Sequence, residues 1–180
     1  DLEPKRDITL QRVSIFAKNR QIKSFKDLVS MIRFDTLLRQ DLLNLVTVNE
    51  TYFYRELAQL KDVIYYAKEL GEARILCAPC SSGDEVYSLA MLAYEFGLKQ
   101  SDIQLTGIDI NSEAIQACSV GCYGERSLHR LSEFQKERFF TKKDDKFFIK
   151  KEILPRCEFK ILNVFDDAMF NLGKFDIVLS

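Results

Sequence analysis

The feature that most constrains the fold is an apolar run at residues 73–78 that leads into a short turn and then a helical pattern. The turn contains Gly83, whose missing side chain lets the backbone approach a ligand closely. A strand, a glycine-containing turn and a helix in this order are typical of nucleotide-type cofactor sites in parallel sheets. This segment therefore predicts an α/β protein with a ligand site at the turn.

The same alternation extends along the rest of the chain. Strands are predicted at residues 74–78, 104–109, 158–164 and 175–179, and helices at residues 56–70, 85–96 and 112–119. Gly71 and Gly97 follow two of these helices in the position of a C-cap, and Asn111 or Ser112 is the expected N-cap of the third. Strands that alternate with helices indicate a parallel sheet covered on both faces.

Two other regions are distinguished by their patterns. Residues 1–48 have helical periodicity, with nine Lys or Arg against six Asp or Glu, so they form a mildly basic helical region. This surface is either a solvated face or a docking surface for an acidic partner.

Residues 49–180 form the α/β domain, and an insert at about 123–157 interrupts it. Two short aromatic runs, 139–141 and 147–149, predict a β-hairpin at the sheet edge that is too short to belong to the core.

Composition excludes several classes of protein. The 180 residues are 47% hydrophobic and 29% charged with a net charge of −1, which gives no argument for nucleic acid or membrane binding. The chain has no apolar run of about 18 residues and begins with no signal peptide, so a cytoplasmic location is expected. Five cysteines and a single histidine, His129, lack metal-site spacing; we expect structural thiols, no metal, and a surface histidine. One histidine also excludes hydrolases with a Ser-His-Asp or Cys-His site.

The residues around the turn favour a cationic ligand. Asp84 and Glu85 follow it at a helix N-terminus, where they would repel a pyrophosphate and attract ammonium and sulfonium groups. Asp109 ends the second strand and can accept hydrogen bonds from ribose hydroxyls. Asn163, after the third strand, is either an adenine contact or a turn-forming residue. These residues indicate S-adenosyl-L-methionine as the cofactor.

The segment at residues 49–55 indicates the acceptor. A carboxylate is already ionised at neutral pH, so its methylation depends on alignment more than on acid–base help. Arg55 can align a carboxylate through two hydrogen bonds. Tyr52, Phe53 and Tyr54 could wall the cofactor through cation–π contacts, or they could pack between helix and sheet. The segment therefore predicts a methyltransferase that acts on an acid.

These motifs together resemble the chemotaxis receptor methyltransferases of the CheR family, in the family's order and spacing. They are Asn49-Glu50-Thr51-x-Phe53-x-Arg55, Cys80-Ser81-Ser82-Gly83-Asp84-Glu85 followed by Tyr87-Ser88, Asp109-Ile110-Asn111 and Ile161-Leu162-Asn163. The resemblance covers the chain from about Arg33 to its last residue. It implies a Rossmann-like methyltransferase sheet.

The resemblance also implies an activity and a site. The activity is transfer of a methyl group from S-adenosylmethionine to glutamates on the cytoplasmic helices of chemoreceptors, yielding γ-glutamyl methyl esters and S-adenosylhomocysteine. Arg55 would lie near the transferred methyl group and is the predicted catalytic residue. The implied cofactor-binding residues are Asn49, Thr51, Arg55, Glu85, Asp109, Asn163 and Val164, to which we add Gly83 of the turn. The N-terminal helices would face the receptor, and the insert would match the family's β subdomain, which in some members tethers a receptor peptide.

The chain departs from the family pattern in three places. Ser82 and Asp84 stand where the family usually has Thr and Glu, and the hairpin tip lacks glycine. The family continues beyond the position of Ser180, so the domain is expected to be incomplete at its C-terminus. The alternatives to receptor methylation are a methyltransferase of another acidic substrate and a non-catalytic module that binds the cofactor or the receptor. The sequence gives no indication of an oligomeric state.

Overall fold

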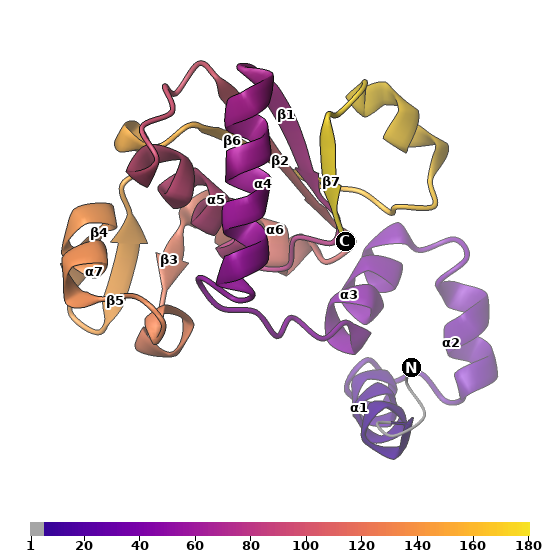
Figure 1. Ribbon diagram of the computed structural model, residues 1–180. Coiled ribbons are helices and arrows are strands. Elements are labelled where there is room, and N and C mark those ends of the chain that lie inside the picture. Colours follow the sequence, from indigo (N-terminus) through magenta and orange to yellow (C-terminus); the bar gives the residue numbers. More distant parts are fainter. Residues whose placement is uncertain (1–5) are drawn as a thin grey trace. The chain divides into compact units, whose positions relative to one another are not determined.

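The computed structural model describes residues 6–180, which divide into two compact units (Figure 1). One unit ends at Val48 and the other is Asn49–Ser180. Residues 1–5 of the predicted N-terminal region lie outside the described residues. Within residues 6–180, no helix is long and apolar enough to cross a membrane.

The first unit consists of three helices, as its periodicity predicts. They are α1 (Arg6–Asn19), α2 (Phe25–Met31) and α3 (Thr36–Val46). Ser24 is the N-cap of α2, because its Oγ accepts a hydrogen bond from Asp27 N at 3.1 Å. Asp35 caps α3 in the same way, through Leu38 N at 2.9 Å. A small core of its own holds the unit together, and its buried members are Phe16, Ala17, Leu28 and Leu38.

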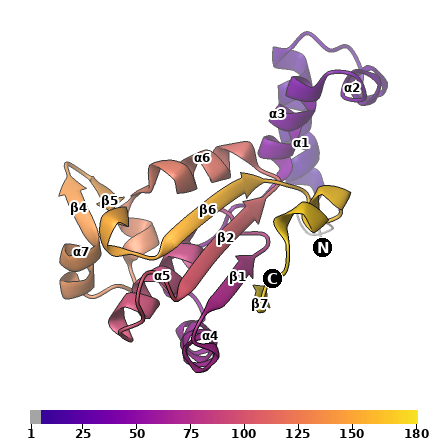
Figure 2. The same cartoon turned by 90° about the horizontal axis from the view of Figure 1, so that it is seen from above.

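The second unit is built on a four-stranded parallel sheet (Figures 1 and 2), which confirms the predicted α/β class. Its strands are β1 (Ala73–Cys77), β2 (Ile103–Asp109), β6 (Arg156–Ile161) and β7 (Ile177–Leu179), in the order β6-β2-β1-β7. The chain moves from β1 outward through β2 to β6 and then returns to the other side of β1. Because ligands bind where the strand order reverses, the carboxyl end of β1 is the expected position of the site.

Three helices cover one face of this sheet. They are α4 (Leu57–Leu70), α5 (Asp84–Glu95) and α6 (Ser112–Val120). Their apolar residues share one core with Ile75 and Cys77 of β1, whereas Leu76 points to the opposite face, as alternation along a strand requires. There it meets a smaller apolar cluster with Met169 and Leu172 of the 3₁₀ helix η4 (Asp167–Leu172).

The insert is more extensive than the predicted hairpin. Its elements are β3 (Cys122–Tyr123), the 3₁₀ helix η2 (Glu125–Leu128), α7 (Glu133–Phe139), β4 (Phe140–Lys143), β5 (Lys146–Ile149) and η3 (Lys151–Ile153). The hairpin of β4 and β5 is confirmed, and β3 pairs with β5 as a third strand. The prediction that the insert stays out of the core is wrong. Phe139, Phe140 and Phe147 are buried in the same core as α5, because aromatic rings at these positions have more apolar area than a hairpin can bury alone.

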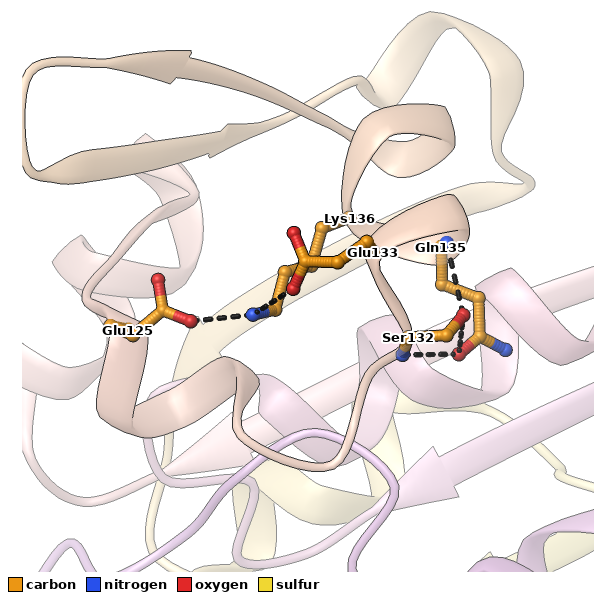
Figure 3. A network of polar contacts seen from close by, with 5 residues as sticks. All are labelled: Glu125, Ser132, Glu133, Gln135 and Lys136. Atoms are coloured by element: carbon orange, nitrogen blue, oxygen red, sulfur yellow. Dashed lines mark hydrogen bonds and ion pairs between the residues drawn. The ribbon is translucent and has the colours of Figure 1, made fainter.

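Polar contacts fix the start of α7 (Figure 3). Ser132 and Gln135 form a capping box, in which Gln135 N donates to Ser132 Oγ and Ser132 N donates to Gln135 Oε1. Lys136 Nζ contacts Glu125 Oε1 at 2.5 Å and Glu133 Oε1 at 2.9 Å, so it ties α7 to η2. A single side chain therefore connects two elements of the insert.

Candidate functional site

The turn after β1 is held from two neighbouring elements of the sheet domain. Cys80 N donates to Ile108 O at 2.8 Å, and Ser81 N donates to Asp109 Oδ2 at 2.8 Å, both on β2. The Cys118 thiol of α6 donates to Ser81 O at 3.2 Å. The turn is thus a defined backbone structure at the carboxyl edge of the sheet.

Gly83 occupies the turn for a reason that differs from the predicted one. Its φ of +82° is a conformation that favours glycine, and a Cβ there would lie 2.9 Å from Cys118 Sγ and 3.2 Å from Phe159. The space beside Gly83 is therefore filled by protein, so the missing side chain permits close packing of α6 and β6. A direct approach of ligand to Gly83 stays a prediction.

Asp109 organises the site. Its carboxylate accepts hydrogen bonds from Ser81 N and from Asn111 N, each at 2.8 Å, and only 5% of its surface is exposed. Asn111, and not Asp109, is the N-cap of α6, through Ala114 N. A carboxylate has about four lone-pair positions, so these two bonds occupy about half of them, and ribose binding by Asp109 stays a prediction.

The loop before α4 carries two of its aromatics into the core. Phe53 and Tyr54 are buried, and the Phe53 ring meets the Tyr123 ring edge-on at 4.8 Å. The interpretation of these two residues as cofactor walls is therefore wrong, and the packing alternative holds for them. Tyr52 is half-buried and lies 4.6 Å from the ring of His129, which is exposed as predicted.

Arg55 lies on the same loop with its guanidinium exposed. Its Nη1 donates to Glu50 O at 3.0 Å, which orients the side chain and leaves other N–H donors for a ligand. Burial raises the pKa of Glu85, and the Cys77 thiol and the charge of Arg55 lower it. Tyr54 N donates to Ser88 Oγ at 3.0 Å, so the loop is attached to α5, the helix that carries Glu85.

The other predicted residues lie on the two flanks of this region. Asn49 and Thr51 belong to the Arg55 loop, where Asn49 is exposed and Thr51 is half-buried. Asn163 and Val164 follow β6 and are exposed; Leu162 N donates to Asp109 O at 3.0 Å, which brings this segment beside Asp109. Asn163 Oδ1 accepts from Phe165 N at 3.0 Å, so its turn-forming role is observed, and its contact with adenine stays a prediction.

Asp84 does not face the ligand region in the way the sequence suggested. It is fully buried, and Ser82 Oγ donates to its Oδ2 at 2.6 Å. No described residue makes a hydrogen bond to its Oδ1. Burial raises the pKa of Asp84, whereas the hydroxyls of Ser82 and Ser127 act in the opposite direction. Of the two acids at the start of α5, Glu85 is the one partly open to a ligand.

The buried carboxyl predicts a pH-dependent stability. The folded-state pKa of Asp84 lies above its ordinary value of 3.8, so the protonated carboxyl adds to the free energy of unfolding. This stabilisation is complete below pH 3.8 and is lost as the pH rises through the folded-state pKa. The side chain of Asp84→Asn stays neutral at every pH. We therefore expect the melting temperature of the variant minus that of the wild type to increase from pH 4 to pH 8. Thermal melts at several pH values, with the exposed-site variant Asp62→Asn as control, test this. A difference that does not change with pH would contradict it.

The cysteines contribute packing, as predicted. All five are free thiols, and Cys77, Cys80 and Cys118 are buried. Burial is the largest cause that raises the pKa of Cys77 and Cys157, which makes these thiols poor nucleophiles. Across residues 6–180 no group of three or more His, Cys, Asp or Glu side chains is arranged to hold a metal ion.

Two parts of this region were not foreseen from the sequence. Tyr123 OH donates to Ser82 O at 2.9 Å, and Ser127 O accepts from Phe53 N at 2.9 Å, so the insert contacts both the turn and the Arg55 loop. A signal was present in the apolar positions around Tyr123 and Leu128, which mark a buried segment inside a charge-rich insert.

The donor set fits S-adenosylmethionine. Residues 78–84 contain no lysine or arginine to neutralise a pyrophosphate, whereas the carboxylates of Glu85 and Asp109 stand at this edge of the sheet. Carboxylates suit an ammonium or sulfonium group and the hydroxyls of a ribose.

Comparison with known proteins gives a consistent result. Residues 49–180 match the family described as CheR methyltransferase, SAM binding domain. The chain is 46% identical over 182 residues to a chemotaxis protein methyltransferase of Campylobacter jejuni subsp. jejuni (strain 81-176), covering 100% of this chain and 69% of the relative. It is 31% identical to chemotaxis protein methyltransferase 1 of Pseudomonas aeruginosa, over 97% of this chain and 69% of the relative. It is 29% identical to chemotaxis protein methyltransferase 2 of Vibrio cholerae, over 94% of this chain and 62% of the relative.

Proposed function

Because the chain belongs to the CheR family of chemotaxis methyltransferases, we propose that it methylates glutamate side chains on the cytoplasmic domain of chemoreceptors. The matching domain makes S-adenosylmethionine the cofactor, in a Rossmann-like fold. The products would be γ-glutamyl methyl esters, and the reaction would take place in the cytoplasm. The observation that carries the proposal is an exposed Arg55 on a loop that is anchored to α5, the helix that follows the turn after β1, through the bond from Tyr54 N to Ser88 Oγ at 3.0 Å.

The reaction places modest demands on the protein. When bound, the cofactor would supply a methyl group on a positively charged sulfur. A carboxylate oxygen would form the new bond to this methyl group, and the sulfur would keep the electron pair of the bond that breaks. No proton moves, so the site needs alignment and not a strong base. The Arg55 guanidinium would hold the incoming carboxylate, and its bond to Glu50 O limits the orientations it can adopt.

The remaining predicted residues are proposed as cofactor ligands. Asp109 would bind the ribose and Glu85 the cationic end, with Asn49, Thr51, Asn163 and Val164 around them. The first unit, whose residues include an excess of basic side chains, is proposed to face the acidic receptor helices.

Transfer of labelled methyl to a receptor cytoplasmic fragment tests the function. Incubation of the protein with labelled S-adenosylmethionine and the fragment, followed by base, is expected to release volatile methanol, because carboxyl methyl esters are base-labile. A fragment whose accepting glutamates are replaced by alanine is the control. Base-stable label would indicate a different acceptor atom. Binding of S-adenosylhomocysteine without transfer to either fragment would favour another acidic substrate or a non-catalytic module.

A further inference from the structure

The turn after β1 (residues 79–83, the cofactor turn) contains one residue, Ser81, in a conformation that its residue type rarely adopts. Ser81 has a φ of +47° and Gly83 a φ of +82°, both in the left-handed region. A serine rarely adopts that region, and such residues persist where surrounding structure holds them. The shape of the turn therefore depends on its external hydrogen bonds.

Those bonds come from three elements. Asp109 on β2 holds Ser81 N, and Cys118 on α6 holds Ser81 O. The third is the bond from Tyr123 OH to Ser82 O at 2.9 Å. Two anchors belong to the sheet domain itself, whereas Tyr123 lies on β3, which pairs with β5 in the sheet of the insert.

The same part of the insert also holds the Arg55 loop. Ser127 O, in η2, accepts from Phe53 N at 2.9 Å, and the ring of Phe53 meets that of Tyr123 edge-on at 4.8 Å. Phe53 is two residues from Arg55. The segment from Tyr123 to Ser127 thus contacts both the loop that carries the arginine and the turn that faces the cofactor.

We propose that Tyr123 is a positioning residue. Its hydrogen bond to Ser82 O and its contact with Phe53 fix the position of the cofactor turn relative to the Arg55 loop. This inference rests on the proposed cofactor site. It assigns the insert a role within the reaction centre, separate from any contact with a receptor. Burial raises the pKa of Tyr123 well above its ordinary value, so the hydroxyl stays a donor throughout the physiological range.

Tyr123→Phe isolates the hydrogen bond. The variant keeps the ring and its contact with Phe53, and it leaves Ser82 O without this donor. A turn that can relax binds the cofactor less well, and we expect the Kd of S-adenosylhomocysteine, measured by calorimetry, to rise by about tenfold. In the methyl-transfer assay, the KM for S-adenosylmethionine should rise while kcat changes less than about twofold.

Tyr54→Phe is the matched control. Tyr54 is equally buried, and its hydroxyl donates to Glu95 at 3.2 Å, at the end of α5 that lies away from the turn. Loss of this bond should lower the melting temperature by a similar amount and change the Kd less than twofold. A selective loss of affinity in Tyr123→Phe supports the inference.

The other outcomes overturn it. If both variants lose affinity equally, the effect is general loosening, and if neither does, the bond to Ser82 has no role in binding. A wild-type protein that does not bind S-adenosylhomocysteine would overturn the proposed site and this inference together. Normal wild-type binding with an unaffected Tyr123→Phe variant would remove this inference alone.

Discussion

Replacing Arg55 with alanine is expected to reduce methyl transfer by about 100-fold or more, while the Kd of S-adenosylhomocysteine changes less than about threefold. The guanidinium is exposed and acts through its direction and charge, so its loss removes alignment of the acceptor without opening the core. Transfer to the receptor fragment and calorimetry measure the two quantities on the same preparation.

Arg55→Lys serves as the comparison. Lysine keeps the charge but has no planar fork for a carboxylate, so its rate should fall between those of the wild type and Arg55→Ala. A lysine variant with full activity would mean that charge alone suffices. Normal turnover in Arg55→Ala would remove Arg55 from the reaction.

Asp109→Ala should have the largest effect on cofactor binding, with a loss of about 100-fold in the affinity for S-adenosylhomocysteine, which corresponds to about 2.7 kcal/mol. Two effects combine, because the variant loses the proposed ribose contact and leaves Ser81 N and Asn111 N without their acceptor. Each unsatisfied buried group costs about 1–3 kcal/mol, so the melting temperature should fall as well.

Asp109→Asn separates these two contributions. The amide retains one acceptor oxygen, so it can preserve one of the two backbone bonds, and its affinity should be intermediate. Calorimetry at a temperature where circular dichroism shows all variants folded is the measurement. Unchanged affinity in Asp109→Ala would exclude Asp109 from the cofactor site.

The parallel sheet was predictable because its signals are local. Residues 73–77 form a short, largely apolar run that ends before turn residues, Gly71 is the C-cap of α4, and Gly97 follows α5 directly after its C-cap residue. Such patterns need no knowledge of distant residues. The crossover connections between strands indicate parallel pairing, whereas the order β6-β2-β1-β7 was not predicted.

The insert was harder to predict because its structure depends on contacts made far along the chain. Phe139 ends α7 and is not in a strand, since the Ser132 capping box starts a helix that no apolar periodicity indicates. Tyr123 ends the two-residue strand β3, in which it pairs with Phe147 of β5. A segment this short carries no periodicity of its own.

The sequence by itself determined the class of fold, the family and the positions of the charged groups, because each of these is written in residue identity and local spacing. The tertiary structure decided which polar groups are open to a ligand. Asp84 and Glu85 are neighbours in sequence, yet burial makes the first a structural acid and leaves the second partly exposed. Packing likewise turned Phe53 and Tyr54 inward and left Arg55 outside. Burial depends on contacts between distant residues, which no local pattern encodes.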